Sequence, residues 1–315
     1  MILIAALLVA AGAVAVATPA ALSRIDFSAA PAIGMAAWLG AFAAALGYVA
    51  LALIALAWPG YPPGETFVGS ALTCLGALEP IVVTWTAGLV APVTAIGFTA
   101  PTGQLARIAL GHRERGAALR RKHNELVEVL GRADTARADL VWLEHPVPLA
   151  YSVAGRGGYV VVTDGLARCL TEAQWRAVLA HEHAHLRGFH HQILGVCQVF
   201  ARAFPWIPLF AAAPAAMATL IELAADRAAA AEAGPQALAA ALRTVASRTT
   251  TALDLVDKSL ELRLQCLSAP PESRAAGRRR APPGAAGRCS WSSGRFCWLP
   301  QSRSSPSDRS PRSPI

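Results

Sequence analysis

Residues 171–191 read TEAQWRAVLAHEHAHLRGFHH, and this stretch decides the local fold. Thr171 and Gln174 have the spacing of a capping box, in which two side chains bond the free backbone groups at a helix start. Apolar residues then recur at helical spacing as far as Leu186. We therefore expect a helix that begins near Thr171 and ends near Gly188.

Within this helix, His181-Glu182-His183-Ala184-His185 fits the pattern H-E-x-x-H. Positions i and i+4 lie on one helix face, so His181 and His185 can both offer a ring nitrogen to one zinc ion. Glu182 stands beside the first of them, where it can accept a proton from an attacking water molecule. His183 points away from that face. The pattern predicts one zinc ion per chain and Glu182 as the catalytic base.

A catalytic zinc site uses three protein ligands and keeps a fourth position for water, so one ligand remains to be found. Glu222 is one candidate, on a second helix where Asp226 follows one turn later and can hold a histidine ring. His191 is the other, because it extends the motif to H-E-x-x-H-x-x-G-x-x-H. That pattern would need Met217 in a turn below the site, and Met217 lies in an alanine-rich helical stretch. We expect Glu222 to be the ligand and His190 to lie at the surface.

The chain between the motif and Glu222 must bring the two together. Residues 192–221 are mostly apolar, and one straight helix of that length would run ~45 Å, across the membrane. Proline breaks a helix interior, and three prolines interrupt this run: Pro205, Pro208 and Pro214. We therefore predict a hairpin with a helix over 192–204, a bend over 205–214 and a return helix carrying Glu222. Each arm would be too short to span, so the hairpin would dip into the bilayer or pack on the spans.

The composition indicates a membrane protein of mainly α-helical fold. Hydrophobic residues make up 54% of the 315 residues and charged residues only 15%, against about 25% charged residues in a soluble domain. Three charge-free runs predict transmembrane helices over residues 2–22, 31–58 and 80–100. The first run lacks the basic start of a signal peptide, which favours a membrane span.

Basic residues directly after the third run set the expected orientation. They are Arg107, Arg113, Arg115, Arg120, Arg121 and Lys122. The loop before that run, residues 59–66, has no Lys or Arg. Because loops rich in Lys and Arg stay in the cytoplasm, we expect the chain from residue 102 onward to be cytoplasmic.

The chain is expected to have three parts. Transmembrane helices occupy residues 1–101, and a zinc metallopeptidase domain that includes the apolar hairpin occupies residues 102–267. This domain is expected to be a small α+β domain, because residues 158–163 are rich in β-branched side chains and predict a strand. Residues 268–315 contain nine Arg, one Asp and one Glu, which is +7 of the total charge of +8. We expect this tail to be disordered, and we expect no direct binding of nucleic acid.

Several stretches carry a resemblance to a known family. They are Ala150-Tyr151-Ser152, Val160-Val161-Val162-Thr163-Asp164-Gly165-Leu166, Ala177-Val178-Leu179-Ala180-His181-Glu182 and the later E-x-x-x-D. With the multi-span start, the chain resembles the BlaR/MecR-type membrane metallopeptidases, the antirepressor proteases. It is more distantly similar to the HtpX and CAAX-prenyl-protease gluzincins. The resemblance implies a gluzincin-like fold with His181, His185 and Glu222 as zinc ligands. The penicillin-binding sensor domain of that family has no counterpart in this sequence.

The sequence therefore predicts a membrane-embedded zinc endopeptidase that cleaves a cytoplasmic protein. The expected partners are the lipid bilayer and a protein substrate, which the resemblance implies to be a winged-helix transcriptional repressor. A non-catalytic membrane signalling protein with a vestigial zinc site is the alternative. The intact Glu182 counts against this alternative, because a structural zinc site does not need a base at that position.

Overall fold

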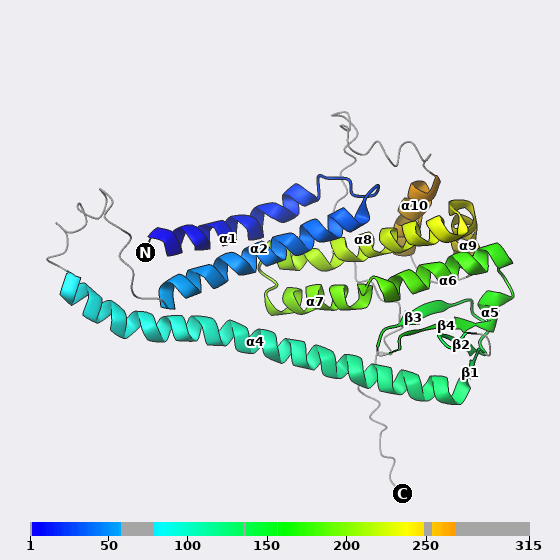
Figure 1. Ribbon diagram of the computed structural model, residues 1–315, viewed down its shortest axis with the longest axis horizontal. Coiled ribbons are helices and arrows are strands. Elements are labelled where there is room, and N and C mark those ends of the chain that lie inside the picture. Colours follow the sequence, from blue (N-terminus) through cyan, green and yellow to red (C-terminus); the bar gives the residue numbers. More distant parts are fainter. Residues whose placement is uncertain (1, 58–78, 135–136, 156, 249–253, 269–315) are drawn as a thin grey trace, which may run out of the picture. The chain divides into compact units, whose positions relative to one another are not determined.

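The computed structural model describes residues 2–57, 79–134, 137–155, 157–248 and 254–268. The described part is mostly helical, with one small sheet (Figure 1). Its helices are α1 (Ile2–Leu22), α2 (Pro31–Ala57), α4 (Glu79–Leu130), α5 (Asp164–Ala167), α6 (Glu172–Arg187), α7 (His190–Ala203), α8 (Pro208–Ala233), α9 (Pro235–Arg248) and α10 (Asp254–Ser268). Its strands are β1 (Gly131–Ala133), β2 (Leu140–Leu143), β3 (Ala150–Val153) and β4 (Tyr159–Thr163). The predicted tail beyond residue 268 lies outside the described residues.

Three helices in the described part are long and apolar enough to cross a membrane. They contain the spans Leu3–Leu22, Pro31–Ala55 and Pro208–Ala233. The first two agree with the predicted transmembrane helices in α1 and α2. The predicted third span, residues 80–100, falls in α4, but the side chains of residues 79–98 are outside the described part. That span stays a prediction, while α4 itself continues unbroken to Leu130.

The sheet lies next to the helix that carries the histidine motif. Its strand order is β1-β2-β4-β3, with β2 and β4 parallel and the two outer pairs antiparallel. The predicted strand over 158–163 is therefore the inner strand β4, and its three consecutive valines are fully buried. Leu179 of α6 packs against Val160 and Val162, and Trp175 stacks on Trp142 of β2. The sheet thereby supports α6.

Helix α8 joins two hydrophobic cores. Its first half packs against α2, where Phe42 and Trp38 contact a cluster that includes Phe210 and Met217. Its second half packs against α6, α9 and α10, through a cluster that includes Ala229. Figure 1 shows α8 lying between α2 and α6. The residues near the middle of α8 therefore lie at the junction of the apolar helix pair and the sheet-bearing part.

The predicted hairpin is present, with two corrections. The bend lies at residues 204–207, between α7 and α8, and is shorter than the predicted bend over 205–214. Pro208 is at the start of α8, where no N–H is required, and Pro214 lies inside the helix without ending it. The prediction that each arm is too short to span was wrong for α8, which has 26 residues. Packing of α8 against α2 and α7 outweighs the backbone hydrogen bond that Pro214 removes.

Candidate metal centre

Helix α6 presents the two histidines of the motif on one face. The predicted capping box is present, because the Thr171 and Gln174 side chains each accept a bond from the other residue's backbone N–H. The helix ends at Arg187 with Gly188 as its cap. His181 and His185 are both buried, and their Nε2 atoms lie 3.0 Å apart. One helix thus supplies two convergent ring nitrogens.

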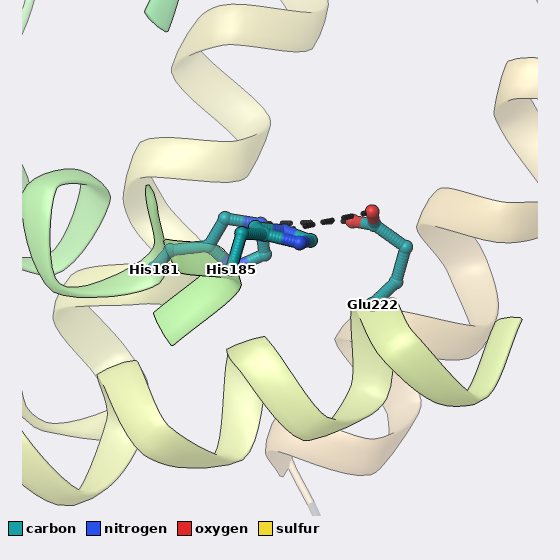
Figure 2. A group of neighbouring side chains, drawn as sticks. All are labelled: His181, His185 and Glu222. Carbon is teal, nitrogen blue, oxygen red and sulfur yellow. Dashed lines mark hydrogen bonds and ion pairs between the residues drawn. The ribbon is translucent and has the colours of Figure 1, made fainter. Parts of the chain in front are cut away.

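Glu222 approaches this pair from α8. Its Oε2 lies 3.6 Å from His181 Nε2, and its Oε1 lies 3.7 Å from His185 Nε2. Figure 2 shows the carboxylate pointing at the two rings from the facing helix. Alanines at the contact between α6 and α8, including Ala180 and Ala229, let the two helices approach closely. The structure therefore places Glu222 beside two histidines that precede it by 37 and 41 residues in the sequence.

The spacing of these three donors fits a zinc ion. Tetrahedral zinc with ligands at 2.0–2.1 Å has neighbouring ligand atoms about 3.3 Å apart. The three separations between the histidine nitrogens and the glutamate oxygens are 3.0, 3.6 and 3.7 Å. Within the described part, His181, His185 and Glu222 are the group able to hold a metal ion. Two imidazoles and one carboxylate match the donor set of a catalytic zinc site that keeps a fourth position open.

His191, the alternative third ligand, is placed differently. Its Nε2 lies 3.1 Å from the Ser152 hydroxyl of β3. Its ring centre is 6.1 Å from that of His185. The geometry therefore groups Glu222, and not His191, with the two histidines of the motif.

Asp226 stands one helical turn after Glu222 and reaches the far side of the His181 ring. Its Oδ1 lies 3.0 Å from His181 Nδ1, although that nitrogen meets no acceptor at hydrogen-bond geometry. A carboxylate behind a ligand histidine fixes the ring and raises its basicity. Asp226 is therefore located where it was predicted, behind the ring of a candidate ligand.

Arg263 of α10 connects the two carboxylates, and sequence reasoning missed it. Its Nε and one terminal nitrogen donate to Asp226 at 2.7 and 2.6 Å. Its other terminal nitrogen lies 3.1 Å from Glu222 Oε2. The arginine side chain is only 13% exposed. The sequence signal that could have led to Arg263 is the pair of carboxylates on α8, because two neighbouring acidic groups require a compensating cation.

Glu182 directly follows His181 in the motif and lies near Ser152 of β3, which acts on its carboxylate as a hydrogen-bond donor. Burial raises the pKa of Glu182, and this effect outweighs the opposing effects of His181 and Ser152. A carboxylate whose pKa is shifted upward toward neutrality is suited to accept and return protons.

The two motif histidines have different proton affinities in the absence of a metal. Burial lowers the pKa of His181, but the adjacent Asp226 and Glu222 carboxylates outweigh burial and raise the pKa to about 9. Burial, followed by the charge of His181, lowers the pKa of His185 to about 3. A proton on His181 and a neutral His185 therefore place one positive charge against the carboxylates, where a metal cation would also be stabilised.

His183 and His190 have structural roles around the centre. His183 points away from the metal face, as predicted, and its ring nitrogens lie 2.7 Å from the Leu179 carbonyl and from Asp139. The expected surface position of His190 was wrong. Its ring is buried, with Nδ1 3.1 Å from Nδ1 of His185. A side chain at Gly188 would collide with the His190 ring, so the glycine makes room for this contact.

Comparisons with known proteins match the part of the chain that contains this site. Residues 113–254 match Peptidase family M48. The plastoglobule-localized metallopeptidase 48, chloroplastic, of Arabidopsis thaliana is 34% identical over 90 residues, which are 28% of this chain and 26% of that protein. No solved structure matches. The part of the chain that carries the two histidines and Glu222 is therefore similar to metallopeptidases of family M48.

Proposed function

We propose that this chain is a membrane-embedded, zinc-dependent endopeptidase of the gluzincin type. The observation that carries the proposal is the convergence of His181, His185 and Glu222 beside Glu182. Three donors leave a position open for chemistry, whereas a structural zinc site is closed by four protein ligands. The partly buried Glu182 would supply the base that such a site requires.

Each residue of the site has a separate role in the proposed peptide hydrolysis. His181, His185 and Glu222 would hold a zinc ion, which would supply a Lewis acid for the carbonyl group and for the attacking water. Glu182 accepts a proton from the attacking water and returns it to the leaving amine. Asp226 holds His181, and Arg263 holds Asp226 and Glu222 in place. Ser152 orients Glu182 from β3.

The proposed location of the site is the cytoplasmic face of a membrane. Glu222 is 14 residues beyond Pro208 in α8, about 21 Å along the helix axis. The α8 segment before Glu222 packs on α2, and the segment after it packs on the sheet-bearing part. The basic residues between Arg107 and Lys122 favour the cytoplasm as the compartment of that part.

The proposed substrate is a cytoplasmic protein, and the proposed role is regulatory. The resemblance to the antirepressor proteases supports a winged-helix repressor as the substrate. Comparative proteomics of cells that carry the wild type or Glu182→Gln tests this role. A repressor fragment found only with the wild type is expected, and equal fragment profiles would reject the regulatory role.

The catalytic proposal is tested separately with purified protein. The full chain in detergent is expected to cleave an unfolded protein such as casein, to lose this activity with a chelator and to regain it with zinc. His185→Ala is expected to be inactive when zinc is supplied at about one ion per chain. A wild-type protein that binds zinc and cleaves nothing would favour the alternative, a signalling protein with a vestigial site.

A further inference from the structure

A cavity of about 290 Å³ lies between α4 and the connection from β3 to β4, outside the metal centre. The α4 side of its lining consists of Ala117, Arg120, Arg121 and Asn124. The other side is the end of β3 and the glycine-rich turn, with Val153, Gly155, Gly157, Gly158 and Tyr159. Asn124 and Tyr159 close one wall, because the Tyr159 hydroxyl donates to Asn124 Oδ1 at 2.7 Å. This hydrogen bond joins the two sides of the cavity.

Two arginines give this cavity a positive charge. Neither Arg120 nor Arg121 forms an ion pair with a carboxylate of the described residues, whereas Arg176, Arg187 and Arg263 do. Gly157 has φ +68°, a left-handed conformation, so the turn suits glycine at this position. The glycines also leave the backbone of the turn accessible from the cavity. These features favour a small anionic group as the occupant.

The cavity lies at the end of β3, the strand that borders the metal centre. Ser152 of β3 contacts Glu182 and His191. Ala154 and Gly155, which line the cavity, follow Ser152 by two and three residues. Val153, which also lines the cavity, directly follows Ser152, so at about 3.3 Å per strand residue the lining lies ~3–10 Å along the chain from Ser152. β3 is the last strand in the sheet order, and its outer edge pairs with no described strand.

We propose that this cavity binds an acidic side chain of the substrate, within about three residues of the cleaved bond. The proposal rests on the proposed peptidase function. A substrate segment extended along the free edge of β3 would place one side chain over the cavity, where Arg120 and Arg121 bind its carboxylate. An anionic lipid headgroup has similar chemistry, but the position beside β3 and Glu182 favours the peptide.

Cleavage of matched peptides tests this specificity. Peptides released from a protein digest by the zinc-loaded full chain are sequenced to find whether Asp or Glu recurs at one distance from the cut. A cleaved peptide is then synthesised with Glu, Gln or Lys at that position. The wild type is expected to prefer Glu over Gln by about tenfold in kcat/KM, as for a charge-assisted hydrogen bond. The ratio is expected to fall to about one in Arg120→Ala/Arg121→Ala.

Two further double variants of α4 test whether the preference depends on the charge of the cavity. Arg120→Glu/Arg121→Glu is expected to prefer Lys at the same position, with unchanged zinc content. Arg113→Ala/Arg115→Ala, which removes two arginines of α4 outside the cavity lining, is expected to keep the preference for Glu.

The outcomes separate this proposal from the proposed function. Equal cleavage of the Glu and Gln peptides by the wild type would overturn the acidic-residue site while leaving the peptidase intact. A preference for Glu that survives in Arg120→Ala/Arg121→Ala and in Arg120→Glu/Arg121→Glu would do the same. A third outcome is that anionic lipid stabilises the wild-type protein but not Arg120→Ala/Arg121→Ala, while the peptide preference is the same in both. That result would identify the cavity as a lipid-binding site. Absence of any cleavage would instead reject the peptidase function itself.

Discussion

Arg263 holds Asp226 through two hydrogen bonds of 2.6 and 2.7 Å, and both residues are almost completely enclosed. The same guanidinium reaches Glu222 at 3.1 Å. A single cation from α10 therefore compensates two carboxylates of α8 at the candidate metal centre. The bond also ties α10 to the helix that carries the third proposed ligand.

Arg263→Ala is expected to destabilise the metal-free protein by about 3 kcal/mol, because the proton on His181 is then the remaining positive charge beside two carboxylates. Zinc is expected to restore more stability to this variant than to the wild type, since the divalent metal supplies the missing positive charge. Thermal unfolding in detergent, with and without zinc, measures both effects. Arg263→Lys should recover only part of the loss, because lysine lacks the planar fork. The control Arg243→Ala, on exposed α9 surface, should unfold like the wild type; a matching curve for Arg263→Ala would refute the argument.

Glu222→Ala is expected to lower the zinc content of the purified protein to well below one ion per chain. His191→Ala is expected to retain zinc, because its ring contacts Ser152 and lies away from the three-donor cluster. Metal analysis after dialysis against low free zinc compares the two. The reverse pattern would identify His191 as the ligand and would reject the assignment of Glu222.

The sequence was sufficient for the elements whose signals are local. The capping box at Thr171, the i, i+4 histidines and the valine-rich strand all predicted structure that is present. The assignment of Glu222 came from a chemical requirement, the need for one more donor on a nearby helix. The hairpin followed from the length of the chain between the motif and that donor.

Other features depend on packing that no local pattern reveals. Arg263 is 37 residues from Asp226, and nothing in α10 marks one arginine as a buried partner. Pro214 predicted a helix break, yet tertiary contacts keep α8 intact. His190 was expected at the surface. Its burial depends on the room that Gly188 leaves, which the local sequence pattern does not reveal.

His190→Ala is expected to weaken zinc binding by about tenfold, because partners of ligand histidines typically change metal affinity by 10–100-fold. The reason is the contact between the Nδ1 atoms of His190 and His185, which holds the candidate ligand ring. Competition with a zinc-sensitive dye measures the affinity. His183→Ala, which removes a histidine that points away from the centre, serves as the control. Equal affinities in the two variants would deny His190 a role in holding the ring.

A reporter enzyme that folds only outside the cytoplasm is expected to be silent when fused after Gly111. The basic cluster from Arg107 to Lys122 favours retention of this segment in the cytoplasm. A fusion after Gly60, in the predicted external loop, should be active. Strong activity of the fusion after Gly111 would reverse the proposed topology.

The most direct test of the zinc-peptidase account is the activity of Glu182→Gln measured together with its zinc content. The three proposed ligands are untouched by this substitution, so about one zinc ion per chain should remain bound. Loss of the proton acceptor should reduce cleavage by about 100-fold or more. A Glu182→Gln protein that binds zinc and cleaves as fast as the wild type would contradict the central claim.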